Sequence, residues 1–376
     1  MAFTDDIENS LYDHIRGCVL NSDGSLNYYL KNDDWTEKAD GTASDLTGGD
    51  GNVMVQIPKF YYKQEFVGSV RQYSISATDI SGYTLHPAFN KNGTEEDYRY
   101  ISAYDACVYS DSASDYIGGL NLDDNTGNVN LSLDKLASVK GQYPMVGLTR
   151  DEFRQLADNN GTGWRVGDFW LVSAIQMLYL VEYQDWNSQD NLGDGNTNGS
   201  YVGSSSNQTD SPHTIAGAGD SWANGSTDGT QPSSGAKPGT AYMKYRGIEN
   251  FFGNCWNWVD GVNISSGSSG DWHVSNTDTD FDDDTTTNYD LLVNSMPSDG
   301  YVTDVANASG AFIPSSTGGS SSTFISDQFF DDNGNSDRVA LFGGRADYGA
   351  QAGAFYWGVY DDSGDRRRLF GARLAF

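Results

Sequence analysis

The sequence predicts an α+β fold in which short strands outnumber helices, and three observations lead to this prediction. Aromatic residues are plentiful, with 23 Tyr, 17 Phe and 9 Trp, while Gly, Ser, Asp and Asn dominate much of the remainder of the 376 residues. Helical periodicity is clearest over residues 144–183. Residues 338–376 alternate short apolar pieces with glycine and polar residues. Such a sequence is typical of short strands joined by long polar loops.

Residues 1–50 are polar, apart from one modest helical or strand-like piece over 7–20. We interpret this N-terminal segment as an arm and as a candidate attachment to another protein. Residues 53–63 follow as a strongly β-prone run. Pro58 interrupts the run, because proline cannot donate to a sheet ladder. The main domain is therefore predicted over residues 51–376.

Two helices are predicted between residues 144 and 183. Thr149 and Glu152 form a capping box, in which a hydroxyl and a carboxylate satisfy backbone amides at the start of a helix. An apolar stripe at helical spacing follows the box. A second helix is predicted from Asp168, as its cap, to about Tyr183, with apolar positions that suit packing under a sheet.

Two long stretches of the chain, 187–238 and 264–336, are rich in Gly, Ser, Asn, Thr and Asp. The first contains hardly any large apolar residue. It cannot bury enough surface to offset its own ordering entropy. We therefore interpret 187–238 as a polar insertion in the domain.

The C-terminal segment, residues 338–376, mixes apolar and polar positions at short intervals. Its apolar pieces (339–342, 354–357, 369–370 and 374–376) are predicted to be buried strands of one sheet, with exposed polar turns or strand faces between them. Arg, Tyr and Asp held on glycine-punctuated β-structure are the residue types that build protein-recognition surfaces. The exposed set comprises Arg345, Asp347, Tyr348, Gln351, Tyr360, Asp361, Asp362, Asp365, Arg366, Arg367 and Arg368.

Two blocks of sequence resemble a known family. LFGGRADYG, the spacing of AGAFYW and the terminal LFGAR resemble the variable region of diversity-generating retroelement target proteins. Residues 245–261, YRGIENFFGNCWNWVDG, are similar to the GN-x-W-x-W signature of the C-type lectin fold of the formylglycine-generating-enzyme type, on which such proteins are built. Residues 53–63, 82–89 and 98–104 resemble the opening strands of phage relatives. The resemblance implies a C-type lectin-like fold with long polar loop insertions.

In phages the members of this family are receptor-binding tropism determinants. The resemblance therefore implies an adhesion protein on a virion surface, with a host cell-surface protein or glycan as its partner and other virion proteins bound through the N-terminal arm. A structural tail or fibre component without diversification is the alternative. The absence of a reverse transcriptase gene and of a near-repeat of the 3′ coding end would favour that alternative.

The family also implies which positions vary. Error-prone reverse transcription randomises adenines in a template copy, so that AAC or AAT codons for Asn come to encode many residues. Eight residues here are reachable from such codons by changing adenines only: Arg345, Asp347, Tyr348, Gly358, Tyr360, Asp361, Asp365 and Arg367. Arg366 is reachable from a Ser codon, whereas Gln351 is not reachable from an Asn codon and departs from the pattern. The predicted ligand-binding set consists of these ten residues and Arg368.

An enzyme of the same fold is an oxidase, and it needs a pair of cysteines at its active site. Cys255 stands at an aliphatic position of the core signature, and Cys18 and Cys107 lie far from the C-terminal region that would supply a partner. A buried thiol is the favoured role of Cys255. The histidines are scattered, and the three cysteines match neither a disulfide framework nor a zinc motif. We expect neither catalysis nor a cofactor.

Two acidic stretches, 278–284 and 331–337, carry oxygen donors at alternating positions but fail the calcium-loop pattern. We interpret both as solvated acidic loops, with a structural cation as the less favoured alternative. The Glu-Pro-Asn and Gln-Pro-Asp motifs of calcium-dependent sugar binding are missing. The tryptophans of the core signature, Trp256 and Trp258, are expected in the core rather than in a ligand platform.

The net charge of −30 would repel a phosphate backbone, so the sequence predicts no nucleic-acid binding. The C-terminal segment departs from this balance, with six Arg against four Asp. The N-terminal sequence MAFTDDIENS lacks the apolar core of a signal peptide. The longest apolar run, 169–181, is too short for a membrane span, which takes about 20 residues. We expect a protein that is made in the cytoplasm, is not inserted in a membrane and leaves the cell on a particle released by lysis.

Overall fold

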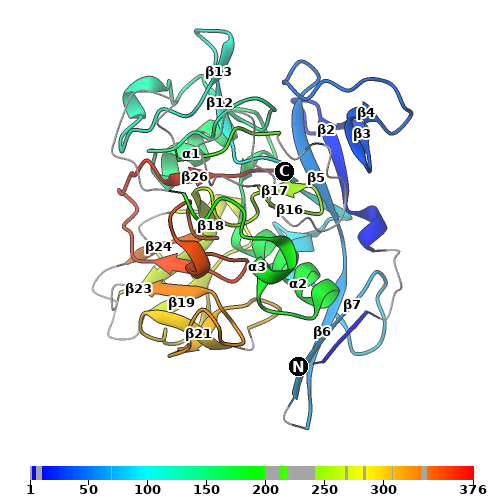
Figure 1. Ribbon diagram of the computed structural model, residues 1–376, viewed down its shortest axis with the longest axis vertical. Helices are drawn as coiled ribbons and strands as arrows, with labels where there is room; N and C mark the ends of the chain where they lie inside the picture. Colours follow the sequence, from blue (N-terminus) through cyan, green and yellow to red (C-terminus); the bar gives the residue numbers. More distant parts are fainter. Residues whose placement is uncertain are drawn as a thin grey trace.

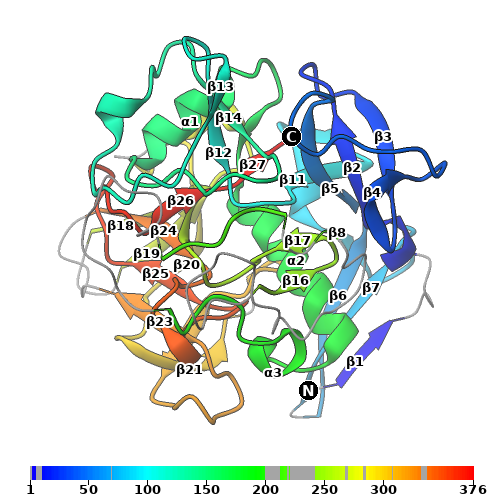
Figure 2. The same ribbon diagram turned by 45° about the horizontal axis from the view of Figure 1, so that its top comes forward.

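The computed structural model describes residues 2–5, 11–68, 70–199, 212–217, 220, 242–266, 270–282, 285–306, 308–331 and 337–376. These residues form a mixed α+β structure that consists mostly of sheet, which confirms the predicted class at this level. Figure 1 shows the N-terminal strands, in blue, on one side of the molecule and the C-terminal strands, in orange and red, on the other. The helix α2 (Phe169–Tyr183) lies between these two groups of strands in both ribbon views (Figures 1 and 2).

A seven-stranded sheet forms most of the N-terminal side. Its strands in spatial order are β15 (Arg165–Val166), β27 (Leu374–Ala375), β11 (Tyr98–Ser102), β5 (Asn52–Pro58), β2 (Arg16–Leu20), β3 (Leu26–Lys31) and β4 (Asp34–Lys38). Pro58 ends β5, as its missing N–H requires. The polypeptide then turns back as β6 (Tyr61–Val67).

A nine-stranded sheet forms the C-terminal side. Its strands in spatial order are β20 (Asp290–Val293), β19 (Asp271–Val274), β18 (Trp256–Ser265), β24 (Arg338–Phe342), β25 (Trp357–Val359), β23 (Gln328–Asp331), β21 (Gly300–Val305) and β22 (Pro314–Thr317), with β26 (Phe370–Ala372) beside β18. The strand β18 carries the tryptophan signature, and Trp258 is 1% exposed.

Smaller sheets and short helices complete the structure. One four-stranded sheet pairs β1 (Ala2–Asp5), β7 (Val70–Ser76), β6 and β8 (Thr84–Leu85). The remaining strands are β9 (Asn90–Lys91) with β10 (Thr94–Glu95), β12 (Cys107–Ser110) between β13 (Asp115–Ile117) and β14 (Lys135–Ala137), and β16 (Lys244–Tyr245) with β17 (Ile248–Glu249). Single 3-10 turns are η1 (Tyr12–His14), η2 (Pro87–Phe89), η3 (Thr126–Asn128), η5 (Asp278–Asp280) and η6 (Gly349–Gln351).

The described N-terminal residues from 11 onward do not form a separate arm, contrary to the prediction for residues 1–50. Strand β2 lies inside the seven-stranded sheet and pairs with β5 from Arg16↔Gln56 to Leu20↔Asn52. Val19 and Leu20 are fully buried. The apolar piece that sequence analysis left open as helix or strand is therefore a core strand, because burying its side chains outweighs the polar character of the flanking residues.

Both predicted helices are present with the predicted caps. The helix α1 (Arg150–Asp158) begins with a capping box in which the Thr149 hydroxyl accepts from the Glu152 amide at 3.1 Å, and the Glu152 carboxylate accepts from the Thr149 amide at 2.8 Å. The helix α2 begins at the Asp168 cap, whose carboxylate accepts from the Leu171 amide at 3.0 Å. It is buried on all sides from Phe169 to Val181, rather than on one face under a sheet. No described helix combines the length and apolar character that a membrane crossing requires.

The polar insertion predicted over 187–238 falls largely on residues 200–211, 218–219 and 221–238, which lie outside the described part of the chain. Its described beginning is packed against the domain. It forms the short helix α3 (Ser188–Leu192), and Asn196 and Thr197 are fully buried.

The C-terminal segment divides between the two large sheets instead of forming strands of one sheet. Strands β24, β25 and β26 belong to the nine-stranded sheet, whereas β27 pairs with β11 and β15 of the seven-stranded sheet. Arg373 lies between β26 and β27 and is 4% exposed. Its guanidinium donates to backbone carbonyls of Ser102, Glu249 and Asn250 and pairs with Asp105 at 3.0 Å. These bonds tie the end of the chain across the domain.

Candidate functional site

The first half of the C-terminal segment presents a group of polar and aromatic side chains on a buried aromatic base, which consists of Trp256, Tyr356 and Phe370. Trp256 is 4% exposed, and its ring centroid lies 5.4 Å from that of Phe370 and 6.3 Å from that of Tyr356. Tyr356 and Phe370 are fully buried. Because these rings are closely packed, they hold fixed positions, and residues that contact them rest on a rigid surface.

Three of the predicted ligand-binding residues lie together on this base. The Arg345 guanidinium carbon is 4.5 Å from the centroids of both the Trp256 and Tyr348 rings. Tyr348 meets Trp256 edge to face at 4.9 Å. Asp347 pairs with Arg345, Nε to Oδ1, at 2.7 Å. Burial raises the pKa of Tyr348 above that of a free tyrosine. The three side chains are half-buried and form one compact patch.

The loop that carries this patch, residues 343–356, is held through its backbone by side chains from other elements. Gln176 of α2 donates to the Ala354 carbonyl at 2.7 Å, and the Ser188 hydroxyl accepts from the Ala354 amide at 2.9 Å. Gln189 donates to the carbonyls of Gly349 and Ala352 at 2.9 and 2.8 Å. The buried Asp327 carboxylate accepts from the Phe355 amide at 2.7 Å. These contacts are independent of the side chains that the loop presents.

Backbone bonds to the tryptophan signature and to the start of the polar insertion complete this support. The Ala346 amide donates to the Asn254 carbonyl at 3.0 Å, and the Gly349 amide donates to the Thr197 carbonyl at 2.8 Å. Gly344 has φ 79° and packs so closely on Ala352 that a Cβ would lie 2.5 Å from the Ala352 Cβ. A glycine at position 344 therefore allows the backbone to turn between the apolar pieces 339–342 and 354–357, as the sequence predicts.

The second half of the segment adds Tyr360, Asp361 and Arg367. Arg367 pairs with Asp361 at 3.0 Å, and its guanidinium carbon lies 5.6 Å from the Phe370 ring centroid. Tyr360 is 43% exposed and packs on Phe330 at 5.0 Å. Burial raises the pKa of Asp361 to about 6, although the charge of Arg367 opposes that shift. Both halves thus contact the same base, through Trp256 in one case and Phe370 in the other.

Not all of the eleven predicted residues have accessible side chains. Tyr360 and Arg367 are exposed, and Asp361 is only 4% exposed. The half-buried residues are Arg345, Asp347, Tyr348, Gln351, Asp365 and Arg366. Gly358 is buried in β25, where it pairs with Leu341 of β24. We name the accessible set, Arg345, Asp347, Tyr348, Gln351, Tyr360, Asp365, Arg366 and Arg367, the display surface.

Arg368 has a structural position rather than a displayed one. It is 7% exposed, and its guanidinium donates to both carboxylate oxygens of Asp123 at 2.7 Å. Its carbonyl lies 2.9 Å from Nε2 of the buried His213. Arg366 pairs with Glu152 in the capping box of α1 at 2.8 Å. Burial would raise the pKa of Glu152, but hydrogen bonds from Arg366 and Thr149 hold that pKa below its usual value. The three consecutive arginines therefore have different surroundings.

The residues that support the display surface were not predicted as part of a site. Gln176 carries the one available signal, since an amide inside an otherwise apolar helix needs a hydrogen-bonding partner. Ser188, Gln189 and Asp327 lie in polar stretches, and nothing in the neighbouring sequence distinguishes them from the other polar residues there. Their role depends on the tertiary path of residues 343–356.

Cys255 and the two acidic stretches were considered above as an oxidase cysteine and as calcium loops. Cys255 is fully buried, and a Cβ at Gly371 would lie 2.8 Å from its sulfur. Burial raises the pKa of this thiol well above its usual value. Asp278 of the first acidic stretch pairs with Lys91 at 2.6 Å. Residues 283–284 and 332–336 of the two stretches lie outside the described chain, and the described residues contain no group suited to hold a metal ion.

Comparison with protein-family models and with curated proteins finds no match to this chain.

Proposed function

We propose that this chain is a viral receptor-binding or adhesion protein whose display surface is an exchangeable contact face on a C-type lectin-like fold of the formylglycine-generating-enzyme type. The sequence blocks LFGGRADYG and GNCWNW support the family, and the mixed α+β architecture is compatible with the fold. The proposed partner is a surface protein or glycan of the host cell. The proposed location is the surface of a virion.

The observation that carries the proposal is the way residues 343–356 are held. Gln176, Ser188, Gln189 and Asp327 bind backbone atoms of this loop at positions 349, 352, 354 and 355, so these bonds can form whichever side chains stand at 345, 347, 348 and 351. A surface that changes its specificity must keep its backbone while its side chains change. Here the residues that hold the backbone are different from the residues whose side chains would contact a ligand, as such a surface requires.

The composition of the display surface also suits protein or glycan recognition. Tyr348, Tyr360 and Arg367 are of the residue types that dominate binding hot spots, where truncation costs about 2 kcal/mol or more. Arg345 and Asp347 are already paired, which lowers the ordering cost of a contact. The surface is small beside the roughly 800 Å² per partner of a stable interface. Multiple copies on one particle would therefore raise the affinity through avidity.

The DNA that flanks the gene provides the test. The proposal predicts a reverse transcriptase gene and a near-repeat of the 3′ coding end in which adenines stand at the codons for 345, 347, 348, 360 and 367. It also predicts that 3′ ends from one population differ mainly at those codons. A genome with neither feature, together with invariant 3′ ends, would favour the alternative of a structural tail or fibre component.

A further inference from the structure

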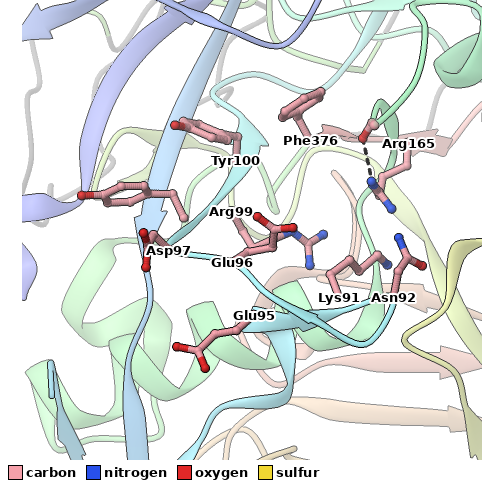
Figure 3. Close-up of a pocket in the computed structure, with 11 residues that line it drawn as sticks. Lys91, Asn92, Glu95, Glu96, Asp97, Arg99, Tyr100, Arg165 and Phe376 are labelled. Atoms are coloured by element: carbon pink, nitrogen blue, oxygen red, sulfur yellow. Dashed lines mark hydrogen bonds between the residues drawn. The ribbon is translucent and has the colours of Figure 1, made fainter. Parts of the chain in front are cut away.

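A surface cavity of about 410 Å³ lies apart from the display surface and has oppositely charged ends. It is bounded by β9, β10, β11 and the residues around Arg165, with Phe376 closing one side. Figure 3 shows Lys91 and Arg165 at one end of the cavity and Glu95 and Asp97 at the other. A cavity of this size accommodates a small organic molecule.

The cationic end contains three basic side chains, Lys91, Arg99 and Arg165. Lys91 is 4% exposed and Arg99 is 2% exposed. They share two carboxylates: Asp168 accepts from Arg99 at 2.7 Å and from Lys91 at 3.1 Å, and Asp278 pairs with Lys91 and Arg165. Lys91, Arg99 and Arg165 line the cavity at this end, whereas the carboxylates of Asp168 and Asp278 pair with them from outside the lining. Asp158 and Asp260 also attract Arg165 from outside it. The wall at this end therefore presents positive charge to the cavity.

Burial lowers the pKa of Lys91 to about 8 against the opposing charge of Asp168, and repulsion from Arg99 and Arg165 adds to that shift. Within a cavity wall, where water screens poorly, an anion placed beside these groups would be stabilised.

The other end has an excess of negative charge. Glu95 and Asp97 both pair with the single ammonium of Lys59, each at 2.7 Å. Glu96 is an additional exposed carboxylate of the cavity wall. Tyr98, which is 42% exposed, and Tyr100 add aromatic rings, whose faces attract ammonium groups. This end therefore suits a cation.

We propose that this cavity binds a small zwitterion, with its carboxylate or phosphate at Lys91, Arg99 and Arg165 and its ammonium group at the end formed by Glu95, Glu96, Asp97 and Tyr98. A simple anion in the cavity would be repelled by the acidic end, and a simple cation would be repelled by the basic end. A molecule carrying both charges satisfies both ends. This binding activity is separate from the proposed function of the display surface, and neither depends on the other.

Binding of glycine betaine and phosphocholine to the full chain, followed by ligand-detected NMR, tests the proposal. Choline chloride supplies the cationic part, and sodium acetate and sodium phosphate supply the anionic parts of glycine betaine and phosphocholine, all at matched ionic strength. At least one zwitterion is expected to bind about tenfold or more tightly than either half, since a charge-assisted contact contributes about 1.5–3 kcal/mol. Preference for glycine betaine identifies a carboxylate ligand, and preference for phosphocholine identifies a phosphate ligand.

Variants then locate the site. Arg165→Gln is expected to weaken binding at the basic end about tenfold. Tyr98→Ala and Glu96→Gln, at exposed positions where substitution is expected to cost little stability, should each weaken zwitterion binding several-fold. Lys31→Gln, at a surface ion pair with Glu37, is the matched control and should have no effect. Failure of both zwitterions to bind, equal binding of a half-molecule, or insensitivity to both exposed changes would overturn the proposal.

Discussion

Arg345 lies over the Trp256 ring at 4.5 Å, so that an accessible cation of the C-terminal segment is stacked on a nearly buried tryptophan of the core signature. The two residues come from distant parts of the sequence and have opposite roles. Trp256 belongs to the packed core, whereas Arg345 belongs to the side chains above it. Substitutions of the two residues should therefore have different consequences.

Trp256→Ala is expected to destabilise the protein by about 3–5 kcal/mol, because it leaves a cavity beneath Arg345, Tyr348 and Phe370. Arg345→Ala is expected to cost about 1–2 kcal/mol, since it removes two cation–π contacts, with Trp256 and Tyr348, and one ion pair of a half-buried side chain. Urea denaturation of both variants measures the difference. Equal losses would show that Arg345 is part of the structural core.

Gln176→Leu is expected to destabilise the protein by about 1–3 kcal/mol, because the buried Ala354 carbonyl loses its donor. Gln351→Leu, at a half-buried display position of the same loop, serves as the matched control and should change stability by about 0.5 kcal/mol or less. Thermal denaturation followed by circular dichroism compares them. If Gln176→Leu is neutral, the backbone support described for residues 343–356 is not significant.

The two neighbouring arginines Arg367 and Arg368 provide another comparison. Arg368→Ala is expected to destabilise the protein by about 1–3 kcal/mol, because a buried guanidinium loses its hydrogen bonds to the exposed Asp123 carboxylate and its packing in the domain. Arg367→Ala is expected to cost about 1 kcal/mol or less, since its side chain is largely exposed and its ion pair is screened by water. Chemical denaturation distinguishes the two variants. A larger loss of stability for Arg367→Ala than for Arg368→Ala would contradict the assignment of Arg367 to the display surface and of Arg368 to a structural role.

Stability should depend on pH through Asp327. Burial raises the pKa of its carboxyl to about 8, well above that of an unfolded aspartate. The folded state therefore binds the proton more tightly than the unfolded state, and the stability it contributes is present at low pH. That contribution is lost as pH rises from about 4 through 8. Asp361, with its pKa raised to about 6, acts in the same direction over a narrower range.

Unfolding free energies measured between about pH 6.5 and 7.5 should thus decline with pH, because the opposing contributions of the buried His86, with its pKa lowered to about 3, and of Lys91 and Lys244, with pKa values lowered to about 8, lie mainly below and above that window. Asp327→Asn should reduce the slope, because an amide cannot ionise but can still accept from the Phe355 amide. Asp33→Asn, at an exposed position, is the control and should leave the slope unchanged. A slope that is identical in wild type and Asp327→Asn would contradict the shifted pKa.

Local signals predicted much of the fold. The capping box at Thr149 and the cap at Asp168 each mark the start of a helix with only a few neighbouring residues, and the tryptophans of the core signature are buried as expected. The N-terminal segment was misassigned because the short apolar piece ending at Leu20 is ambiguous until its partner β5 is known. The division of the C-terminal segment between two sheets is set by the pairing of β26 with β18 and of β27 with β11 and β15, and these partners are distant in sequence.

The candidate site was predictable only in part, for the same reason. Residue type indicated that Arg345, Tyr348, Tyr360 and Arg367 suit a recognition surface. It could not show that Arg368 is buried against Asp123, because an arginine run has no internal signal of which member turns inward. The charged cavity at Lys91 likewise depends on residues from several separate segments.

The tolerance of the backbone to changes in the display surface is the most direct test of the account. A library randomised at Arg345, Asp347, Tyr348 and Gln351 should contain mostly folded proteins, with melting temperatures within a few degrees of wild type. A matched library randomised at Gln176, Ser188, Gln189 and Asp327 should contain few. If the two libraries yield equal fractions of folded protein, or if the first yields mostly unfolded chains, the separation of display from support is contradicted.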